Sequence, residues 1–261
     1  MAVVPHHAVT FLASGGYSKV YKVKDRDVVI KCSQDVEGTR REYETMLRLG
    51  GLSTIVAPLG FEELSGWAAL SMEHGGSTLL DGVQSMRDLS EIRSVVLQVQ
   101  TAVAQLHAVG VAHLDVKLEN FVINHIGRVR IIDFGFALYV PSHLRDTFKD
   151  VFHRGTVAYC APEVLSKALA DPFQADLWSL GVTIFAVATG RLPFCEASIR
   201  DVRFELFNRK RSKLAPMDCI RAVYQQTYDQ IGSGTQLEVA INNLLLAEPG
   251  RRKNVLLEQI A

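Results

Sequence analysis

The residues best suited to chemistry lie close together between positions 111 and 135. Asp115, Lys117 and Asn120 stand within one short stretch, and Asp133 opens the tripeptide Asp-Phe-Gly. Two short β-rich runs on either side of a polar turn at 124–127 predict a hairpin, which would bring these side chains together at one end. Asparagine and aspartate oxygens are ligands that Mg²⁺ prefers, so Asn120 and Asp133 are metal candidates. The carboxylate of Asp115 is then free to accept a proton.

The composition is that of an ordinary globular protein. The chain has 261 residues, of which 48% are hydrophobic and 21% charged, and this length suits one large domain or two lobes. The 28 basic and 28 acidic residues balance, so we expect no charge-driven binding to nucleic acid or to a membrane surface. The longest apolar run, near Trp178–Ala188, is shorter than the roughly 20 residues that a membrane-spanning helix needs, so no membrane insertion is expected.

The cysteines and the first residues bear on the compartment. The four cysteines show no C-x-x-C spacing, which favours a reduced intracellular protein, cytoplasmic or nuclear. Residues 1–7 lack the basic segment and the long apolar segment of a secretory signal. Oligomeric state leaves no mark in the sequence.

The first third of the chain favours strands around one helix. Phe11–Val23 alternates as strands do around a glycine turn, so its backbone N–H groups could approach a phosphate closely, although an ordinary hairpin explains the same pattern. Asp27–Lys31 is a short β-branched strand that ends in lysine, and residues 38–49 have the apolar spacing of a helix. Strands at 55–61 and 67–72 lead into glycines that predict a hinge.

The rest of the chain favours helices. Leu89–Val109 has helical spacing and stops at a glycine, and Asp176 begins a strongly apolar helix that runs to about Thr189. Residues 214–245 also have helical spacing, and the basic cluster at 209–213 is more typical of a solvated helix end than of a nuclear signal or docking patch. We therefore predict an α+β fold, with strands first and helices after.

The motifs together resemble the catalytic domain of the eukaryotic-type serine/threonine protein kinases. The resemblance rests on the D-x-K-x-x-N cluster, on Asp-Phe-Gly and on Ala161-Pro162-Glu163 farther along, and it extends over about residues 11–255. It implies a two-lobed fold with an N-lobe at about 11–72, formed by a small antiparallel β-sheet and one main helix. A hinge at about 73–77 and a mostly helical C-lobe at about 78–261 follow, and residues 1–10 form an N-terminal extension. It also implies ATP and Mg²⁺ as cofactors and protein serine or threonine hydroxyls as substrates.

The resemblance assigns roles to individual residues. Asp115 would orient the substrate hydroxyl and accept its proton, and Lys117 would neutralise charge on the transferred group, while Asn120 and Asp133 would hold Mg²⁺. Lys31 would bind phosphate while paired with Glu42, with Glu44 as the competing partner. The residues implied in nucleotide binding are Leu12, Ala13, Gly15, Gly16, Ser18, Val20, Lys31, Glu42, Met72, Glu73, Gly75 and Val122. Met72 would stand beside the adenine, the backbone of Glu73 and Gly75 would bind it, and Val122 would form the floor below it.

Other residues are implied to support these. Thr156 would brace Asp115 and Lys117, Asp176 would bond the backbone of the catalytic loop, and His113 would pack without acting as a base. Arg252 would form a buried pair with Glu163, whose loss of one partner typically costs about 3–5 kcal/mol.

The sequence departs from the family pattern at several positions, among them Val29, which replaces the alanine of the strand that ends at Lys31. Ala13 and Ser18 occupy glycine positions of the phosphate-binding loop, and Leu114 replaces the arginine that normally meets a phosphorylated activation segment. Because leucine cannot bind phosphate, we expect a weaker dependence on phosphorylation of that segment, in which Ser142 and Thr147 are the candidate sites. Two alternatives stay open: a pseudokinase that serves as a nucleotide-binding scaffold, and a kinase for a small molecule or lipid, against which the segment 156–163 argues.

Overall fold

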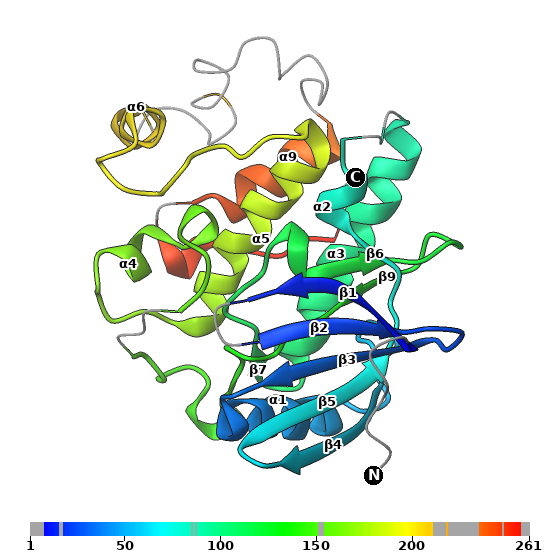
Figure 1. Ribbon diagram of the computed structural model, residues 1–261. Helices are drawn as coiled ribbons and strands as arrows, with labels where there is room; N and C mark the ends of the chain where they lie inside the picture. The colour runs from blue at the N-terminus through cyan, green and yellow to red at the C-terminus, as the bar shows by residue number, and fades with distance from the viewer. Residues whose placement is uncertain are drawn as a thin grey trace.

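The computed structural model describes residues 8–15, 18–84, 86, 88–150, 154–210, 218, 235–246 and 248–256. The described chain forms a sheet-rich N-lobe that leads into a helix-rich C-lobe, as predicted (Figure 1). None of its helices is long and apolar enough to cross a bilayer. Gly16, most of the basic cluster at 209–213 and most of the stretch 214–245 lie outside the described residues.

The N-lobe is a five-stranded antiparallel sheet with one helix on its inner face. The strand order is β1-β2-β3-β5-β4. Alternate residues of β5, Ala68, Leu70 and Met72, are buried, as expected for a strand with one face in the core. The strands and the helix are β1 Val9–Ser14, β2 Ser18–Val23, β3 Val28–Ser33, α1 Val36–Arg48, β4 Pro58–Leu64 and β5 Trp67–Glu73.

Two boundaries in this lobe differ from the sequence prediction. Helix α1 begins two residues earlier than predicted, because Asp35 caps it by accepting a hydrogen bond from the N–H of Gly38 (2.8 Å). Strand β4 begins at Pro58 rather than at Ile55, because Ile55 forms an isolated bridge with Ile131 instead.

The C-lobe is built on α5, Pro172–Thr189, which is buried on nearly all sides. It packs against α3, Leu89–Ala108, and against α9, Gln236–Leu244. A Cβ at Gly181 would lie 2.8 Å from Leu245 Cδ2, so this close packing requires glycine. Helix α5 begins four residues before the predicted Asp176, because Asp171 caps it and Pro172 fills its first position.

Short elements between the lobes carry the predicted chemistry. Strands β8, Phe121–Ile123, and β9, Val129–Ile131, form the predicted hairpin, and β6, Ser77–Thr78, pairs with β8. A second small sheet joins β7, Val111–Ala112, to β10, Leu138–Tyr139. The remaining helical elements are α2 Leu79–Gly82, the 3₁₀ turn Leu118–Asn120, the 3₁₀ turn Ser142–Leu144, the 3₁₀ turn Val157–Tyr159, α4 Pro162–Leu165, α6 Val202–Lys210 and the 3₁₀ turn Pro249–Arg251.

Candidate active site

The loop that carries Asp115 is held in place by the carboxylate of Asp176 on α5. Its two oxygens accept the backbone N–H groups of His113 and Leu114, each at 2.7 Å. Leu114 has φ +64°, a conformation that is unfavourable for a branched side chain. The two hydrogen bonds from the α5 carboxylate therefore hold a strained turn in place immediately before Asp115. Asp176 lies where the family resemblance implied, and His107 Nε2 also contacts it at 2.9 Å.

The carboxylate of Asp115 is surrounded by donors. Its Oδ1 accepts from the backbone N–H (2.8 Å) and the hydroxyl (2.9 Å) of Thr156. Its Oδ2 lies 2.7 Å from Lys117 Nζ and accepts from Asn120 Nδ2 (3.0 Å). Lys117 also donates to the hydroxyl of Thr156 (2.7 Å). The structure thus brings the D-x-K-x-x-N residues and Thr156 together, with the carboxylate fixed in one orientation.

Asn120 and Asp133 come together through the β8–β9 hairpin. The amide nitrogen of Asn120 donates both to the Asp115 carbonyl (2.8 Å) and to its carboxylate, so the side-chain oxygen of Asn120 is left as an acceptor. The backbone N–H of Ile132 donates to the Asn120 carbonyl (2.9 Å), which sets Asp133 beside Asn120. One amide oxygen and one carboxylate form a donor set that suits Mg²⁺, which takes few protein ligands and keeps water or phosphate oxygens as the others.

Lys31 bridges the two lobes. Its Nζ lies 2.7 Å from Glu42 Oε2 and 2.8 Å from Asp133 Oδ1. Burial alone would lower the pKa of Lys31, but the carboxylates of Glu42 and Asp133 outweigh it and raise the pKa, so the lysine stays charged. The predicted Lys31–Glu42 pair is confirmed, whereas Glu44 is exposed.

The two carboxylates beside Lys31 differ in their electrostatics. Burial raises the pKa of Glu42, although the charge of Lys31 opposes this shift. Burial would also raise the pKa of Asp133, but Lys31 and its hydrogen bond prevail and lower it. Asp133 therefore remains ionised, as a metal ligand must be.

The glycine hairpin forms the open side of the site. Its strands pair with a register shift between Phe11 and Ala13, and the N–H of Gly15 donates to the Ser18 carbonyl (2.8 Å) to close the turn. Leu12 and Ala13 are exposed, whereas Val20 is partly buried against the core. The hairpin therefore offers backbone more than side chains.

The hinge lies directly on Val122. Met72 is buried in β5 opposite Val29, and Glu73 ends that strand. A Cβ at Gly75 would lie 2.1 Å from Val122 Cγ2, so the hinge backbone approaches β8 more closely than any other residue would allow. The residues implied for the two sides of the adenine site are thus neighbours.

The implied pair below the site is also present. Arg252 contacts Glu163 through two hydrogen bonds of 2.5 and 2.9 Å, and it also donates to the carbonyls of Leu246 and Gln174, both at 2.8 Å. The arginine side chain is fully buried. The planar guanidinium therefore ties α4 to the start of α5 and to the end of the described chain.

The sequence analysis missed one buried charge near the site. Arg130, in the middle of β9, forms an ion pair with Glu73 of the hinge (2.6 Å). The signal was present, because an arginine interrupts the otherwise apolar run Val129–Ile132, and a buried charge in such a run calls for a partner.

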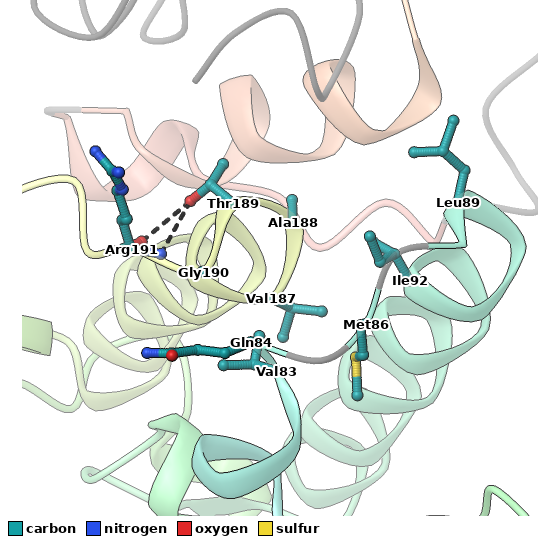
Figure 2. Close-up of a pocket in the computed structure, with 10 residues that line it drawn as sticks. All are labelled: Val83, Gln84, Met86, Leu89, Ile92, Val187, Ala188, Thr189, Gly190 and Arg191. Atoms are coloured by element: carbon teal, nitrogen blue, oxygen red, sulfur yellow. Dashed lines mark hydrogen bonds between the residues drawn. The ribbon is translucent and has the colours of Figure 1, made fainter. Parts of the chain in front are cut away.

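A cavity of about 660 Å³ lies elsewhere in the C-lobe, and its lining includes none of the predicted site residues (Figure 2). Its wall is formed by the end of α5 and the two residues after it, and by Val83, Gln84, Met86, Leu89 and Ile92. Thr189 and Arg191 hydrogen-bond to each other there. Val83, Ile92 and Val187 of its wall are almost fully buried by other protein atoms, whereas Leu89 is 56% exposed. It is separate from the site around Asp115.

Comparison with known proteins places these features in a family. Residues 7–252 match the family model described as protein kinase domain. The chain is 32% identical over 230 residues to serine/threonine-protein kinase ULK1 of Homo sapiens, covering 78% of this chain and 21% of that protein. It is 32% identical over 209 residues to CBL-interacting serine/threonine-protein kinase 15 of Arabidopsis thaliana, covering 74% and 48%. It is 39% identical over 126 residues to testis-specific serine/threonine-protein kinase 5 of Mus musculus, covering 45% and 33%. The matched region thus spans between a fifth and a half of the length of these relatives.

Proposed function

The chain belongs to the eukaryotic-type protein kinases, and from that premise we propose that it transfers the γ-phosphoryl group of ATP to serine or threonine hydroxyls of protein substrates. The observation that carries this proposal is the Asp115 carboxylate, oriented by Thr156, Lys117 and Asn120. A carboxylate held in this way can receive a proton from a hydroxyl without first reorganising.

The chemical step divides between two residues of the catalytic loop. The substrate oxygen attacks the γ-phosphorus, the bond to the ADP oxygen breaks, and the hydroxyl proton passes to Asp115. Lys117, with Nζ 2.7 Å from that carboxylate, places a positive charge where the transferred group gains negative charge. Positioning and charge stabilisation supply most of the rate, because no covalent enzyme intermediate is required.

ATP would be held between the lobes. Lys31, charged and fixed by Glu42, would contact phosphate oxygens. The backbone of Glu73 and Gly75 would bind the adenine edge, and Val122 would cover one face of the ring. The hairpin around Gly15 would close over the phosphates with backbone N–H groups.

We infer that transfer depends on Mg²⁺. Asn120 and Asp133 would hold the ion, since the amide nitrogen of Asn120 donates to Asp115 and leaves its oxygen to accept, and since Asp133 is ionised. When bound, Mg²⁺ would neutralise part of the phosphate charge. When a nucleotide binds, Lys31 would leave the carboxylate of Asp133 and contact phosphate oxygens instead.

The activation segment favours a protein as the second substrate. Val157–Tyr159 forms a 3₁₀ turn directly after Thr156, and the hydroxyl of Ser179 holds the Tyr159 carbonyl (2.8 Å). The exposed Val157 lies in this turn, beside the residue that orients Asp115. An ordered, partly apolar rim next to the catalytic carboxylate suits an extended peptide better than a small polar molecule.

We also propose that the activity needs no phosphate on the activation segment. Leu114 is buried, so an apolar side chain fills the place of the phosphate-binding arginine. The segment has other anchors, because Val140 donates its N–H to Gly110 (2.8 Å) and Asp150 forms a β-bridge with Ala170. Activity that persists after phosphatase treatment is the expected result, and activity abolished by that treatment would contradict it.

An intracellular location, in the cytoplasm or nucleus, is part of the same proposal. Cys32, Cys160 and Cys195 are all free thiols in the described part of the chain. Free thiols are maintained in reducing compartments.

The test is transfer of labelled γ-phosphate from ATP and Mg²⁺ to casein and myelin basic protein. We expect label on serine and threonine that is lost in Asp115→Asn and in Lys31→Met. A matched pair on α1 sharpens the result: Glu42→Gln removes the partner of Lys31, whereas Glu44→Gln changes an exposed neighbour and should leave the rate unchanged.

Two outcomes would overturn parts of the proposal. Label on tyrosine alone would contradict the serine/threonine assignment. No transfer by the wild type, together with ATP binding that persists in Asp115→Asn, would favour the nucleotide-binding scaffold, for which Ala13, Ser18 and Leu114 are the departures from the family pattern.

A further inference from the structure

Arg130 is a buried cation whose presence packing does not explain. Only 6% of the residue is exposed, and its Nε has no hydrogen-bond partner among the described residues. A buried charge carries a desolvation cost, and an apolar residue of similar size is often neutral or stabilising in its place. The arginine therefore needs a reason other than the stability of β9.

The ion pair described for Arg130 connects it to the hinge. Arg130 Nη1 lies 2.6 Å from Glu73 Oε2, and this hydrogen bond is the main cause that lowers the pKa of Glu73. The pair joins the last residue of β5 to the middle of β9, three positions before Asp133. It therefore connects the lobe that would bind adenine to the hairpin that carries the metal candidates.

The register of the small sheet explains why Arg130 reaches the hinge. Val122 of β8 stands opposite Arg130 of β9, and residues directly opposite each other in an antiparallel pair project from the same face. Val122 meets Gly75 on that face. The guanidinium of Arg130 thus extends beside the floor of the adenine site and ends at Glu73.

Further hydrogen bonds meet at the same place. The N–H of Ile131, next to Arg130, donates to the Thr54 carbonyl (2.8 Å), and the N–H of Glu73 donates to the Ala57 carbonyl (2.9 Å). The hinge, the α1–β4 loop and β9 are therefore joined around one ion pair. A change in that pair would move the hinge relative to Val122.

We propose that Arg130 is a positioning residue for nucleotide binding: by holding Glu73, it sets the hinge backbone at Glu73–Gly75 against Val122. The inference rests on the proposed function, since it takes the ligand to be ATP. In this role Arg130 would act through Glu73 and not through a contact of its own with the adenine or the phosphates. Its effect should therefore appear in the binding of the base and not in the chemical step.

The experiment measures equilibrium binding of adenosine and of ATP with Mg²⁺, together with the KM for ATP, the KM for casein and kcat. For Arg130→Met we expect adenosine and ATP to bind about tenfold more weakly, by the same factor, because both share the adenine contact. The KM for casein and kcat should stay within about twofold of wild type, because interactions at separate sites are independent. Arg128→Met removes an exposed arginine just before β9 whose charge acts on Glu73 much less than Arg130 does, so these values should stay within about twofold of wild type.

Two further variants exclude a loss of fold as the cause. Arg130→Lys keeps the charge without the planar fork and should recover part of the affinity. Glu73→Gln removes the same ion pair from its partly exposed side, so the hinge should stay folded in this variant. It therefore tests the inference even if Arg130→Met fails to fold. In Glu73→Gln/Arg130→Met the two losses should not add, because each variant removes the same interaction. Thermal unfolding of every variant accompanies the binding measurements.

The results separate this inference from the proposed function. Unchanged adenosine binding in Arg130→Met, weakening of ATP alone, or a rise in kcat would each overturn the role assigned to Arg130. A wild-type protein that binds adenosine and ATP but transfers no phosphate would overturn the proposed function, while the adenosine comparison would still test Arg130.

Discussion

The glycine hairpin and the catalytic loop are held in opposite ways. In the hairpin, Phe11 is 55% and Leu12 46% exposed, and the turn is closed by the backbone bond between Gly15 and Ser18. In the catalytic loop, Asp115 is 5% exposed and accepts from four donor groups. The first region acts through its backbone, whereas the second acts through particular side chains.

This contrast explains where the sequence departs from the family pattern. Ala13 and Ser18 replace glycines in the hairpin. Ala13 is exposed and Ser18 is partly buried, and both side chains are small. Around Asp115 the identities are kept, except at Leu114, whose backbone is held by Asp176 and whose side chain is buried. A backbone contact tolerates a change of side chain, but a carboxylate that receives a proton, as proposed for Asp115, has no substitute.

The largest effect is expected when the carboxylate of Asp115 is neutralised. Asp115→Asn keeps the shape and most hydrogen-bonding positions but removes the proton acceptor, so kcat should fall by about 10⁴-fold, near the upper end for a general base. The KM for ATP should change little. Steady-state transfer to casein measures both, and a kcat within tenfold of wild type would show that this carboxylate is not the base.

The second prediction compares ion pairs in the two lobes. Arg252 is fully buried with Glu163, so Arg252→Met leaves an uncompensated charge and should lower the free energy of unfolding by about 3–5 kcal/mol. In the N-lobe, Arg40 pairs with Glu63 where both side chains are substantially exposed, so Arg40→Met should cost no more than about 1 kcal/mol.

Urea unfolding gives both values. Arg251→Met is the matched control in the C-lobe, since this neighbour is exposed and only loosely paired with Glu248 (3.8 Å). Equal costs for Arg252→Met and Arg251→Met would contradict the structural role of the buried pair.

The sequence predicted the parts of this site that depend on short spacing. The β8–β9 hairpin, the Lys31–Glu42 pair and the Arg252–Glu163 pair are present as the motifs implied. Only eleven residues separate Lys31 from Glu42, because Asp35 caps α1 two residues after β3 ends. The nucleotide-binding and catalytic roles of the site residues stay predictions, because they concern ligands and not contacts within the chain.

What the sequence did not yield depends on contacts between distant segments. The early starts of α1 and α5 are set by the caps Asp35 and Asp171, whose side chains fit a turn as readily as a cap until the helix is present. The Arg130–Glu73 pair joins residues far apart in the chain, and no local pattern identifies Glu73 as the partner. Gly75 reads as a hinge in the sequence, but its closeness to Val122 appears only in three dimensions.

The third prediction uses one cysteine of the N-lobe sheet and one cysteine near Asp115 as probes. Burial, and secondarily the charge of Asp115, raise the pKa of the Cys160 thiol to about 11, whereas Cys32 on β3 is only partly buried and its pKa is raised by burial alone. Because the thiolate is the reacting species, Cys32 should be alkylated about tenfold faster than Cys160 by iodoacetamide at pH 8. The exposed Cys195 should react first.

Mass spectrometry of the alkylated peptides follows each site, and alkylation in urea should equalise the three rates. Equal rates for Cys32 and Cys160 in the folded protein would show that the catalytic region opens as readily as the N-lobe. Faster reaction at Cys160 would reverse the comparison.

The smallest effect is expected where the sequence departs most from the family pattern. Ala13→Gly and Ser18→Gly restore the missing glycines, yet the contacts that the hairpin would offer ATP come from backbone N–H groups that are already present. Added glycine also costs roughly 0.5–1 kcal/mol of ordering entropy in a strand, so the KM for ATP should change by less than about threefold. A tenfold gain in ATP affinity in the double variant would show that the side chains at 13 and 18 obstruct the nucleotide. The hairpin would then depend on side-chain identity as much as the loop that carries Asp115, and the contrast between the two regions would no longer hold.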